Sequence, residues 1–508
     1  MPPTLVLPRR VSETSLTKKV AVNASALAAG RVAAAGLGVV SVGISSRYLG
    51  LGGYGQLATA VAFAALVGLV ADIGVWNIGV REIAKRPEDT QRIISGLVTA
   101  GLALSLGAAI VGAIAAFAIY PGHGDELIRR AILLLLVTLP LAAPYGAASA
   151  YFIARQQPYM GMLSSVVASV VTVAALVLAT AFDWGFTGVV LAYVSAGVVQ
   201  GLLMIVLARR RVSLRPTSDL TLSRQLLTWA LPLGGAMFVH GIYWRIDIVL
   251  LSVLASHVEV GLYGLVYRMV DALVTLPGFV TITLLPELAR LTEQRARFDQ
   301  IIDKALAVVQ IGALAVFVPF VLFAEEITRL VGGSDFARAA PVLRLLMVGV
   351  ALTYLGSIFA QAIFALNGQG KLFKLSVVLL PANVALNLAL IPAWGASGAA
   401  LAFALTEVIH LAVLLLLYHG SARPPRPRRS VRVLAAAGVS TAAAAVKLLP
   451  LHGEGGTIVT VILGFALALA LYVSTLYALG AMPREVHGNL VLPLWGKLRA
   501  TWAGSAGP

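Results

Sequence analysis

The sequence predicts an all-α integral membrane protein with about 14 transmembrane helices. The residue composition predicts this fold class. Hydrophobic residues make up 59% of the 508 residues, and charged residues make up only 12%. A soluble globular chain instead carries roughly 25% charged and roughly 45–50% apolar residues. Because a helix that crosses a bilayer needs about 20 mostly apolar residues, the roughly 300 hydrophobic residues suffice for about 14 spans.

Charge clusters and Pro/Gly turns delimit the individual spans. The segment 420–430 contains Arg-Pro-Pro-Arg-Pro-Arg-Arg, whose prolines oppose a helix, and we interpret it as the joint before a terminal helix pair. The expected spans are 20–46, 54–80, 93–119, 130–154, 160–182, 186–208, 226–254, 259–285, 304–324, 340–366, 373–392, 396–419, 431–449 and 457–479.

These spans predict seven consecutive regions. Two of them are lobes with an equal number of spans, and short basic segments flank the lobes. In chain order we expect a cytoplasmic tail (1–19), an N-lobe of spans one to six (20–208), a cytoplasmic linker (209–225), a C-lobe of spans seven to twelve (226–419), a Pro/Arg cytoplasmic linker (420–430), spans thirteen and fourteen (431–479) and a cytoplasmic tail (480–508).

Lys and Arg residues gather on one side of the predicted spans. With the N-terminus in the cytoplasm, 28 of the 38 Lys and Arg residues fall in cytoplasmic segments, which is the bias that orients membrane proteins. We therefore expect both termini in the cytoplasm. The same bias accounts for the net charge of +16, so we expect no nucleic-acid partner. The first apolar stretch is too long for the core of a cleavable signal peptide, and we expect it to be retained.

The two lobes carry an internal repeat. Trp184-Gly185 opens the sixth span, and Trp394-Gly395 opens the twelfth span 210 residues later. Tyr54-Gly55 opens the second span, and Tyr263-Gly264 opens the eighth span 209 residues later. Since each lobe has an even number of spans, both lobes enter the membrane with the same polarity. We therefore predict a pseudo-twofold axis along the membrane normal, as in transporters made of two lobes.

Ionisable residues inside the predicted spans are the candidates for function. Such a residue costs roughly 2.5–3.5 kcal/mol at the bilayer centre unless it is paired or wetted. The absence of cysteine excludes thiolate metal sites and cysteine nucleophiles. The candidates are Arg31, Asp72, His240, Arg245, Asp247, Arg268, Asp271, Glu407 and His410.

A structural interpretation of the charges in spans seven and eight is open. At about 1.5 Å per residue, Asp247 and Arg268 lie at similar depth, as do Arg245 and Asp271. They would then form two neutralising pairs that lock the helices together. Asp72 and Arg47 lie closer to span ends, where long polar side chains can reach the interface.

A functional interpretation is also open. Arginine forks bind phosphate bidentately and stay charged at physiological pH, so Arg31, Arg245 and Arg268 are expected to line a cavity for an anionic head group. Glu407 and His410 are three residues apart on one helical face. Either they carry a proton or ion that is coupled to transport, or they form a buried hydrogen bond that has no role in transport. We expect no cofactor and no resident metal, beyond coupling to a proton or sodium gradient.

Enzyme constellations are missing from the sequence. It contains no Gly-rich phosphate loop before a basic helix start and no His-Glu-x-x-His pattern. The adjacent acids Asp125-Glu126 and Glu325-Glu326 fall in outer loops, and we interpret them as solvated surface residues. We therefore expect a transporter and not an enzyme.

The most distinctive local pattern is the first helical hairpin, and part of it recurs in the second half of the chain. The residues of this pattern are Asn23, Arg31, Arg47-Tyr48-Leu49-Gly50, Tyr54-Gly55, Ala71-Asp72-Ile73-Gly74 and Arg81-Glu82-Ile83-Ala84, followed by Asp247, Gly261-Leu262-Tyr263-Gly264 and Leu285-Pro286-Glu287-Leu288-Ala289.

This pattern resembles the polysaccharide-biosynthesis transporters, the Wzx-type flippases of O-antigen and capsule repeat units. They belong to the multidrug/oligosaccharidyl-lipid/polysaccharide (MOP) exporter superfamily, whose fold is MATE-like. The resemblance covers about residues 18–420. It implies a flippase in the bacterial cytoplasmic (inner) membrane that moves an undecaprenyl-pyrophosphate-linked oligosaccharide to the outer leaflet by alternating access.

The resemblance also implies residue roles and partners. Arg31, Arg245 and Arg268 become the candidates for binding the substrate head group, and spans thirteen and fourteen become the candidates for a groove that holds the lipid tail. Cell-surface polysaccharide and lipopolysaccharide synthesis would be the setting. Glycosyltransferases and a polysaccharide polymerase would then be partners in the membrane.

Three other functions remain open at this point. A MATE-type drug or cation antiporter shares the superfamily, although such antiporters usually lack the terminal helix pair and the arginines argue against a cationic substrate. A membrane polysaccharide polymerase or ligase usually carries a large outer loop, whereas the longest outer connection here is the short segment 325–339. An inactive scaffold of a glycan-assembly complex is the third.

Overall fold

The computed structural model describes residues 13–419, 427–449 and 453–481. Within these ranges the chain forms helices and no strand, and the predicted all-α class is confirmed. Helices are favoured because lipid offers no hydrogen-bond partners, so each backbone polar group must be satisfied within its own segment. Residues 1–12 of the predicted N-terminal tail, 420–426 of the predicted linker and 482–508 of the predicted C-terminal tail lie outside the described residues.

Long apolar helices dominate the described part of the chain. There, 10 helices are long and apolar enough to cross a membrane, or 11 if the bent pair Leu220–Pro232 and Met237–Tyr243 is one span. Two of them, Ala29–Lys85 and Gln369–Tyr418, contain 57 and 50 residues, far more than the roughly 20 that one crossing needs. They bend at the non-helical residues Gly50 and Gly395, where we predicted turns between spans. The number of 14 spans stays a prediction.

The described residues fall into two compact units. Unit 1 comprises Met1–Ser45 and Ala60–Gly241 as far as they are described, and unit 2 comprises Ser46–Thr59 and the described residues from Ile242 onward. The middle of the first helix therefore belongs to unit 2, while both of its ends belong to unit 1. The predicted lobe boundaries, which assign 46–59 to the N-lobe, stay a prediction.

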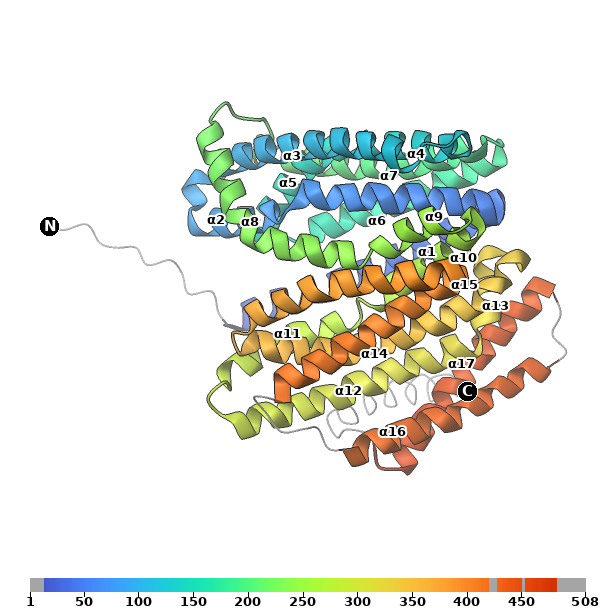
Figure 1. Ribbon diagram of the computed structural model, residues 1–508. Helices are drawn as coiled ribbons and strands as arrows, with labels where there is room; N and C mark the ends of the chain where they lie inside the picture. Colours follow the sequence, from blue (N-terminus) through green and yellow to red (C-terminus); the bar gives the residue numbers. More distant parts are fainter. Residues whose placement is uncertain (1–12, 420–426, 450–452, 482–508) are drawn as a thin grey trace, which may run out of the picture. The chain divides into compact units, whose positions relative to one another are not determined.

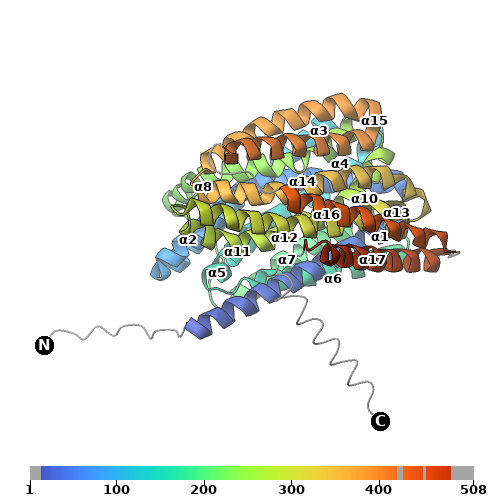
Figure 2. The ribbon, with the colours of Figure 1, turned by 90° about the horizontal axis from the view of Figure 1, so that it is seen from below.

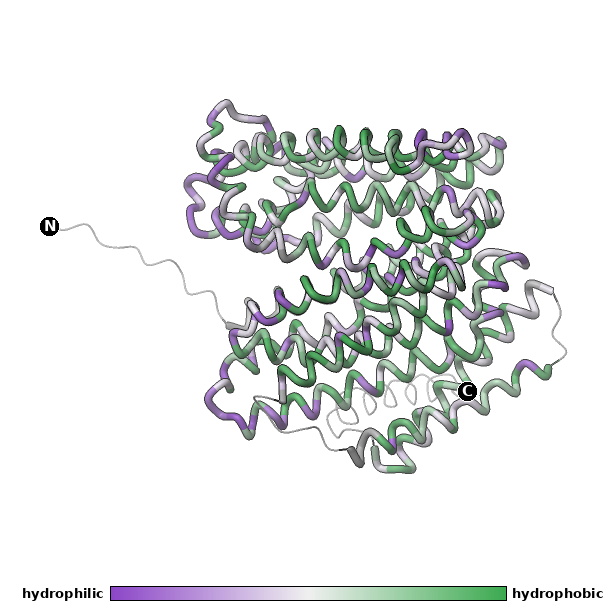
Figure 3. The backbone as a smooth tube through the Cα atoms, viewed as in Figure 1, coloured by the Kyte–Doolittle hydropathy of each residue, from purple (hydrophilic) through white to green (hydrophobic). Residues whose placement is uncertain are grey.

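Unit 1 is built from nearly all of the first half of the chain (Figure 1). Hydrophobic residues run along its long helices, and hydrophilic residues gather at turns such as the one between α2 and α3 (Figure 3). Its elements are α1 (Glu13–Asp72, except Ser46–Thr59), α2 (Val75–Lys85), η1 (Pro87–Asp89), α3 (Thr90–Ile119), η2 (His123–Asp125), α4 (Glu126–Leu136), η3 (Leu139–Leu141), α5 (Ala142–Ala154), α6 (Tyr159–Ala181), α7 (Gly185–Ala208) and α8 (Leu220–Tyr243) up to Gly241.

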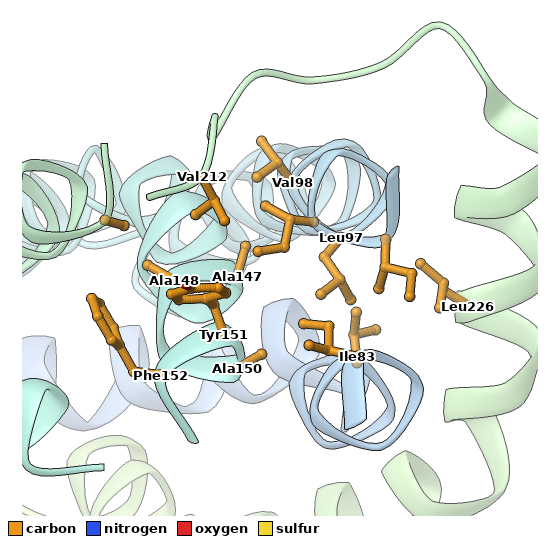
Figure 4. Packing of buried hydrophobic residues seen from close by; sticks show 14 of the residues in the cluster. Ile83, Leu97, Val98, Ala147, Ala148, Ala150, Tyr151, Phe152, Val212 and Leu226 are labelled. Carbon is orange, nitrogen blue, oxygen red and sulfur yellow. The ribbon is translucent and has the colours of Figure 1, made fainter. Parts of the chain in front are cut away.

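The core at one end of unit 1 joins helices that are distant in sequence. Figure 4 shows Ile83 of α2, Leu97 of α3 and Leu226 of α8 directed at one another, with Tyr151 and Phe152 of α5 nearby. All five side chains are buried. This packing fixes the connection between α7 and α8 against α3 and α5.

Unit 2 contains the remaining helices. The helix α16 begins at Pro427, inside the predicted linker, because proline is accepted at the first position of a helix. The elements of unit 2 are α9 (Ile246–Leu254), α10 (His257–Leu273), α11 (Pro277–Arg290), α12 (Arg295–Leu322), α13 (Ala324–Gly332), η4 (Ser334–Ala339), α14 (Ala340–Ala365), α15 (Gln369–His419), α16 (Pro427–Ser440), η5 (Thr441–Leu448) and α17 (Gly453–Ala478).

The last helices pack on α12 and α13, as Figures 1 and 2 both show. Val433 of α16 and Leu476 of α17 are fully buried in a cluster with Val318 of α12. The Tyr472 hydroxyl donates to the carbonyl oxygen of Ile311 at 3.2 Å. Lys447 of η5 pairs with Glu326 of α13 at 2.8 Å. The predicted terminal helix pair is therefore an integral part of unit 2.

The segment Ser46–Thr59 packs against α10 with the two backbones almost in contact. A Cβ atom on Gly55 would lie 1.8 Å from the carbonyl oxygen of His257, and a Cβ atom on Gly261 would lie 2.2 Å from the carbonyl oxygen of Leu51. Beside this contact, the ring of Tyr54 packs edge-on against that of Phe336, with centroids 5.9 Å apart. The two glycine motifs of the internal repeat thus pack on each other.

This contact gives a stability prediction. Replacing Gly261 with leucine should lower the free energy of unfolding by about 1–3 kcal/mol, because the helices must separate to admit the side chain. Thermal unfolding of the purified protein in detergent measures the effect. Gly52→Leu is the matched control, since a Cβ atom on Gly52 meets nothing within 4 Å. Equal melting temperatures for the two variants would contradict the close packing.

Arg47 has a structural role in the same segment. Its guanidinium donates to the carbonyl oxygens of Leu330 at 2.7 Å and Val331 at 3.4 Å, at the C-terminal end of α13. Cations stabilise this end of a helix because its last carbonyls have no partner within the helix. The prediction that Arg47 only reaches toward the interface is therefore incomplete, since the side chain caps α13.

Glu259 holds the kink inside α15. Gly395 has φ of 52°, a backbone conformation that favours glycine. The backbone N–H of the next residue, Ala396, donates to Glu259 Oε2 at 2.7 Å. Glu259 lies in the first turn of α10, after the N-cap Ser256. This bond fixes the start of the second half of α15, which carries Thr406 and Glu407.

Replacing Glu259 should therefore destabilise unit 2, and the loss should depend on whether the new side chain can still accept a hydrogen bond. We expect Glu259→Ala to cost about 1 kcal/mol, the usual value of a lost helix cap. Glu259→Gln should cost less, because its amide oxygen can still accept the Ala396 N–H. Thermal unfolding compares the two variants, and a glutamine variant as unstable as the alanine variant would rule out a capping role.

Candidate functional site

The candidate site lies next to a break in the chain between helices α8 and α9. α8 ends at Tyr243 and α9 starts at Ile246, and the Tyr267 hydroxyl donates to the carbonyl oxygen of Trp244 in the gap. Asp247 follows in the first turn of α9. Interrupted membrane helices place backbone dipoles and charged side chains at depth, which is how transporters build ion and substrate sites.

Asp247 is the centre of a buried polar network in unit 2. Its side chain is 1% exposed. Its Oδ2 atom accepts a hydrogen bond from the Tyr263 hydroxyl at 3.1 Å, and its Oδ1 atom accepts one from Asn387 Nδ2 at 3.1 Å. Asn387 Nδ2 also lies 3.1 Å from Asn383 Oδ1, and Asn383 Nδ2 lies 3.3 Å from the Thr406 hydroxyl. The network joins α9, α10 and both halves of α15.

Four residues of this network carry five side-chain oxygen atoms, and we call them the Asp247 cluster (Asp247, Asn383, Asn387 and Thr406). The Asn387 Oδ1 atom is buried without a hydrogen-bond partner in the part of the chain that the structure describes. The Thr406 hydroxyl donates to the carbonyl oxygen of Ala402 at 2.7 Å, and its oxygen accepts the hydrogen bond from Asn383 Nδ2. One carboxylate with amide and hydroxyl oxygens is the ligand chemistry that a hard cation prefers.

Glu407 extends the polar network along α15. Glu407 is buried, its Oε1 atom accepts a hydrogen bond from the Tyr243 hydroxyl at 2.6 Å, and its Oε2 atom lies 3.4 Å from His410 Nδ1. The predicted contact between Glu407 and His410 is therefore present, with Tyr243 as a third member. Whether it couples transport stays a prediction.

Arg245, Arg268 and Asp271 form a second charged group, which we call the arginine cluster. Arg268 Nη1 lies 3.9 Å from Asp271 Oδ2, and the Arg268 side chain is 52% exposed. The Asp271 carboxylate also interacts electrostatically with Arg245. Two guanidinium groups thus share one carboxylate, so the cluster carries a surplus positive charge and Arg268 remains accessible to an anion.

The pairing of Asp247 with Arg268, which one of the two open interpretations assumes, is not seen among the described residues. Tyr263 and Asn387 bind the carboxylate of Asp247 instead. The face of α10 on which each side chain lies decides this pairing. Tyr263 and Tyr267 are four residues apart, share one face of α10 and stack with centroids 5.7 Å apart. Arg268, five residues after Tyr263, points about 140° away because successive residues turn by about 100°.

The other three candidates, Arg31, Asp72 and His240 of α8, lie in unit 1. Arg31 is in α1 and has an exposed side chain. Asp72 is the last residue of α1, before the left-handed Gly74 that opens α2. Its Oδ1 atom is buried without a hydrogen-bond partner among the described residues. Asp72 thus marks a helix break in unit 1, as Asp247 does in unit 2, and the cavity predicted for the three arginines stays a prediction.

Comparison with known families decides the membership of the chain. The family described as "Polysaccharide biosynthesis protein" matches residues 20–292, more than half of the sequence. The chain belongs to this family. A second family, "Lipid II flippase MurJ", matches residues 246–465, which include the Asp247 cluster and two members of the arginine cluster, Arg268 and Asp271. The family membership that the hairpin pattern predicted is confirmed.

Solved structures support the same fold for this family member. It resembles "Lipid II flippase MurJ, inward closed conformation" with a TM-score of 0.74 and 13% identity, over 90% of this chain and 99% of that one. It also resembles the inward-facing conformation of a multidrug resistance MATE family transporter of the MOP superfamily, with a TM-score of 0.64 and 18% identity over 76% of this chain and 96% of that one. The predicted MATE/MOP-like fold is confirmed.

Two curated relatives from Haloferax volcanii also match. The probable low-salt glycan biosynthesis flippase Agl15 is 25% identical over 174 residues, and the probable flippase AglR is 28% identical over 171 residues. Each match covers 33% of this chain. The aligned segments span about a third of the length of either relative, 37% of Agl15 and 36% of AglR.

The sequence did not lead us to several polar residues of the candidate site. Tyr243, Tyr263, Asn383, Asn387 and Thr406 all take part in the buried network. A signal was present, because Asn383 and Asn387 are four residues apart inside an apolar span. They therefore share one helical face, and polar side chains inside a membrane usually face the protein interior. Tyr263 entered the sequence analysis only as a marker of the repeat, and Tyr243 gave no signal there.

Proposed function

We propose that this chain is a flippase that moves a polyprenyl-pyrophosphate-linked oligosaccharide from the inner to the outer leaflet by alternating access. The observation that carries the proposal is the arginine cluster, in which Arg245 and Arg268 share the single carboxylate of Asp271. A surplus positive charge within apolar helices favours an anionic cargo. The match to the flippase family over residues 246–465 covers Arg268 and Asp271 and supports this choice.

The arginines suit a pyrophosphate. A guanidinium presents paired donors that match two phosphate oxygens, and it keeps its charge at any physiological pH. In this proposal Arg245 and Arg268 bind the phosphates in unit 2, and Arg31 stays a head-group candidate in unit 1. Asp271 keeps the two arginines of unit 2 from repelling each other before the cargo arrives, and then gives up Arg268 to the phosphate.

The Asp247 cluster is proposed as the coupling site for a sodium ion. Its carboxylate would neutralise the ion, and the oxygens of Asn383, Asn387 and Thr406 would replace the water that the ion loses. The cluster joins α9 and α10 to α15, so an ion bound there would tighten unit 2. Arg268 follows Tyr263 and Tyr267 on α10, so the same tightening would reach the arginine cluster.

The cellular setting follows from the cargo. The protein is a multi-pass membrane protein, and we place it in a bacterial cytoplasmic membrane with both termini in the cytoplasm. Its cargo would come from membrane glycosyltransferases and would pass to a polymerase that builds a cell-surface polysaccharide, with O-antigen of lipopolysaccharide as one such product. A polyprenyl carrier such as undecaprenyl pyrophosphate fits a chain that is nearly all membrane helix.

Deletion of the gene in its host tests the proposal. We expect surface polysaccharide to disappear while the lipid-linked oligosaccharide accumulates in the membrane, and we expect a plasmid copy to restore export. Loss of a polymerase would instead leave single repeat units on the outer face. Unchanged surface polysaccharide in the deletion strain would overturn the proposed function.

A MATE-type antiporter is the second candidate, because the fold resembles a multidrug MATE transporter with a TM-score of 0.64. A cationic drug would be repelled by the surplus charge of the arginine cluster, which makes this candidate the weaker one. Expression in a strain that lacks its own drug pumps separates the two. Increased resistance to cationic drugs would favour the antiporter, and unchanged resistance favours the flippase.

A further inference from the structure

Unit 1 contains a cavity that neither the arginine cluster nor the Asp247 cluster uses. It has a volume of about 340 Å³ and lies between α4 and α7, within the range of about 300–1,000 Å³ typical of ligand pockets. Its lining is almost entirely apolar, and the one charged side chain is Arg130. The lining residues are Leu127, Arg130, Ala131, Leu133, Leu134, Phe186, Thr187 and Val190.

The cavity is apolar at its floor and polar at its mouth. Ala131 and Val190 are buried at the floor, whereas Thr187 and Arg130 are exposed. Both helices begin at this end, so the lining reaches about 10 Å along α4 from Leu127 to Leu134, at about 1.5 Å per residue. A ligand with a polar end and an apolar end therefore fits it.

Neighbouring residues place the mouth at the membrane interface. Phe182 and Trp184, just before α7, are exposed, and their rings stack with centroids 6.0 Å apart. Aromatic residues of this kind gather at the head-group level of a bilayer. Farther along the same helices, Val137 and Leu191 are exposed apolar residues, as expected where a helix faces lipid. The occupant of the cavity therefore comes from the bilayer.

The charge at the mouth selects the head group. Arg130 forms an ion pair with Glu126, one turn earlier on α4, and both side chains are more than half exposed. An exposed pair of this kind contributes little stability, so a ligand can separate it at little cost. A lone arginine would attract any anionic lipid, whereas a neighbouring cation and anion complement a head group that carries both charges.

We propose that this cavity binds one acyl chain of a zwitterionic phospholipid with a primary ammonium group, such as phosphatidylethanolamine. The phosphate of the lipid contacts Arg130, its ammonium contacts Glu126, and the upper part of the chain fills the space between α4 and α7. The lipid is a second ligand, separate from the proposed cargo, and it fastens α4 to α7 inside unit 1.

The test uses the full-length protein, purified in mild detergent from membranes that contain both phosphatidylethanolamine and phosphatidylglycerol. Native mass spectrometry counts the lipids that remain bound. We expect about one retained phosphatidylethanolamine per wild-type chain, and at least a fivefold lower occupancy in Thr187→Trp and Leu134→Trp, which fill the cavity. Val137→Trp is the matched control, because Val137 is 72% exposed and outside the lining.

Charge variants test the head group independently of cavity filling. Arg130→Ala and Glu126→Ala alter exposed positions where the fold is not at stake, and each should lower retention of phosphatidylethanolamine severalfold. The exchanged variant with Glu126→Arg and Arg130→Glu should recover it, since both charges are again present. Equal retention in the cavity-filling variants and in Val137→Trp would overturn the proposal. So would equal retention of phosphatidylglycerol and phosphatidylethanolamine by the wild-type chain.

Discussion

Asp247→Asn should reduce sodium-driven export at least tenfold while leaving the protein folded. Asparagine has the same shape and its oxygen can still accept the hydrogen bond from Tyr263, so one hydrogen bond, that from Asn387, is lost. It lacks the negative charge, however, and a sodium ion in a low-dielectric interior then has no compensating charge. The measurement is the rate of lipid-linked oligosaccharide transport in vesicles as a function of an imposed sodium gradient.

The matched control is Asp271→Asn. It also removes a carboxylate from a span of unit 2, but one that pairs with arginine and not with the Asp247 cluster. Transport by this control should still respond to the sodium gradient. If Asp247→Asn transports at the wild-type rate and with the same sodium response, the coupling role of Asp247 is wrong.

Alanine at Arg31 or Arg268 should abolish export without removing the protein from the membrane. Each change deletes a fork that binds phosphate bidentately, and hydrogen bonds to charged groups typically contribute about 1.5–3 kcal/mol, which is roughly 10- to 150-fold in affinity. Lysine at the same positions keeps the charge but not the fork, so it should give partial export. Surface polysaccharide per cell, normalised to the amount of protein in the membrane, is the readout.

Arg329→Ala is the control for these arginines. Arg329 forms an exposed pair with Glu325 on α13, with the two atoms 2.7 Å apart, and it lies outside both clusters. Its loss should leave export unchanged. Normal export by Arg31→Ala and Arg268→Ala at wild-type protein levels would contradict a role of these arginines in binding the head group.

The fold was largely readable from the sequence because membrane helices obey simple rules of length and hydropathy. Both internal kinks, at Gly50 and Gly395, fall where glycine-rich turns were predicted. The membership of Ser46–Thr59 in unit 2 was not readable, because it depends on the packing of Gly55 against Gly261. Such a contact joins residues about 200 positions apart, and local composition carries no information about it.

The site was only partly readable for the same reason. Asp247, Arg245, Arg268, Asp271, Glu407 and His410 all stood out because ionisable residues are rare in spans. Their partners did not, because the choice between Arg268 and Tyr263 for Asp247 depends on the rotation of α10. The helix breaks at Trp244 and after Asp72 make such partners still harder to predict, because a break changes the direction of the side chains that follow it.

Transport in reconstituted vesicles tests the central claim most directly. Purified protein is placed in vesicles with a fluorescent polyprenyl-pyrophosphate oligosaccharide on one leaflet, and an added quencher reports how much of it has crossed. We predict movement that depends on the protein, accelerates with a sodium gradient and is lost in the Arg268→Ala variant. Movement no faster than in protein-free vesicles, with the protein folded, would contradict the account.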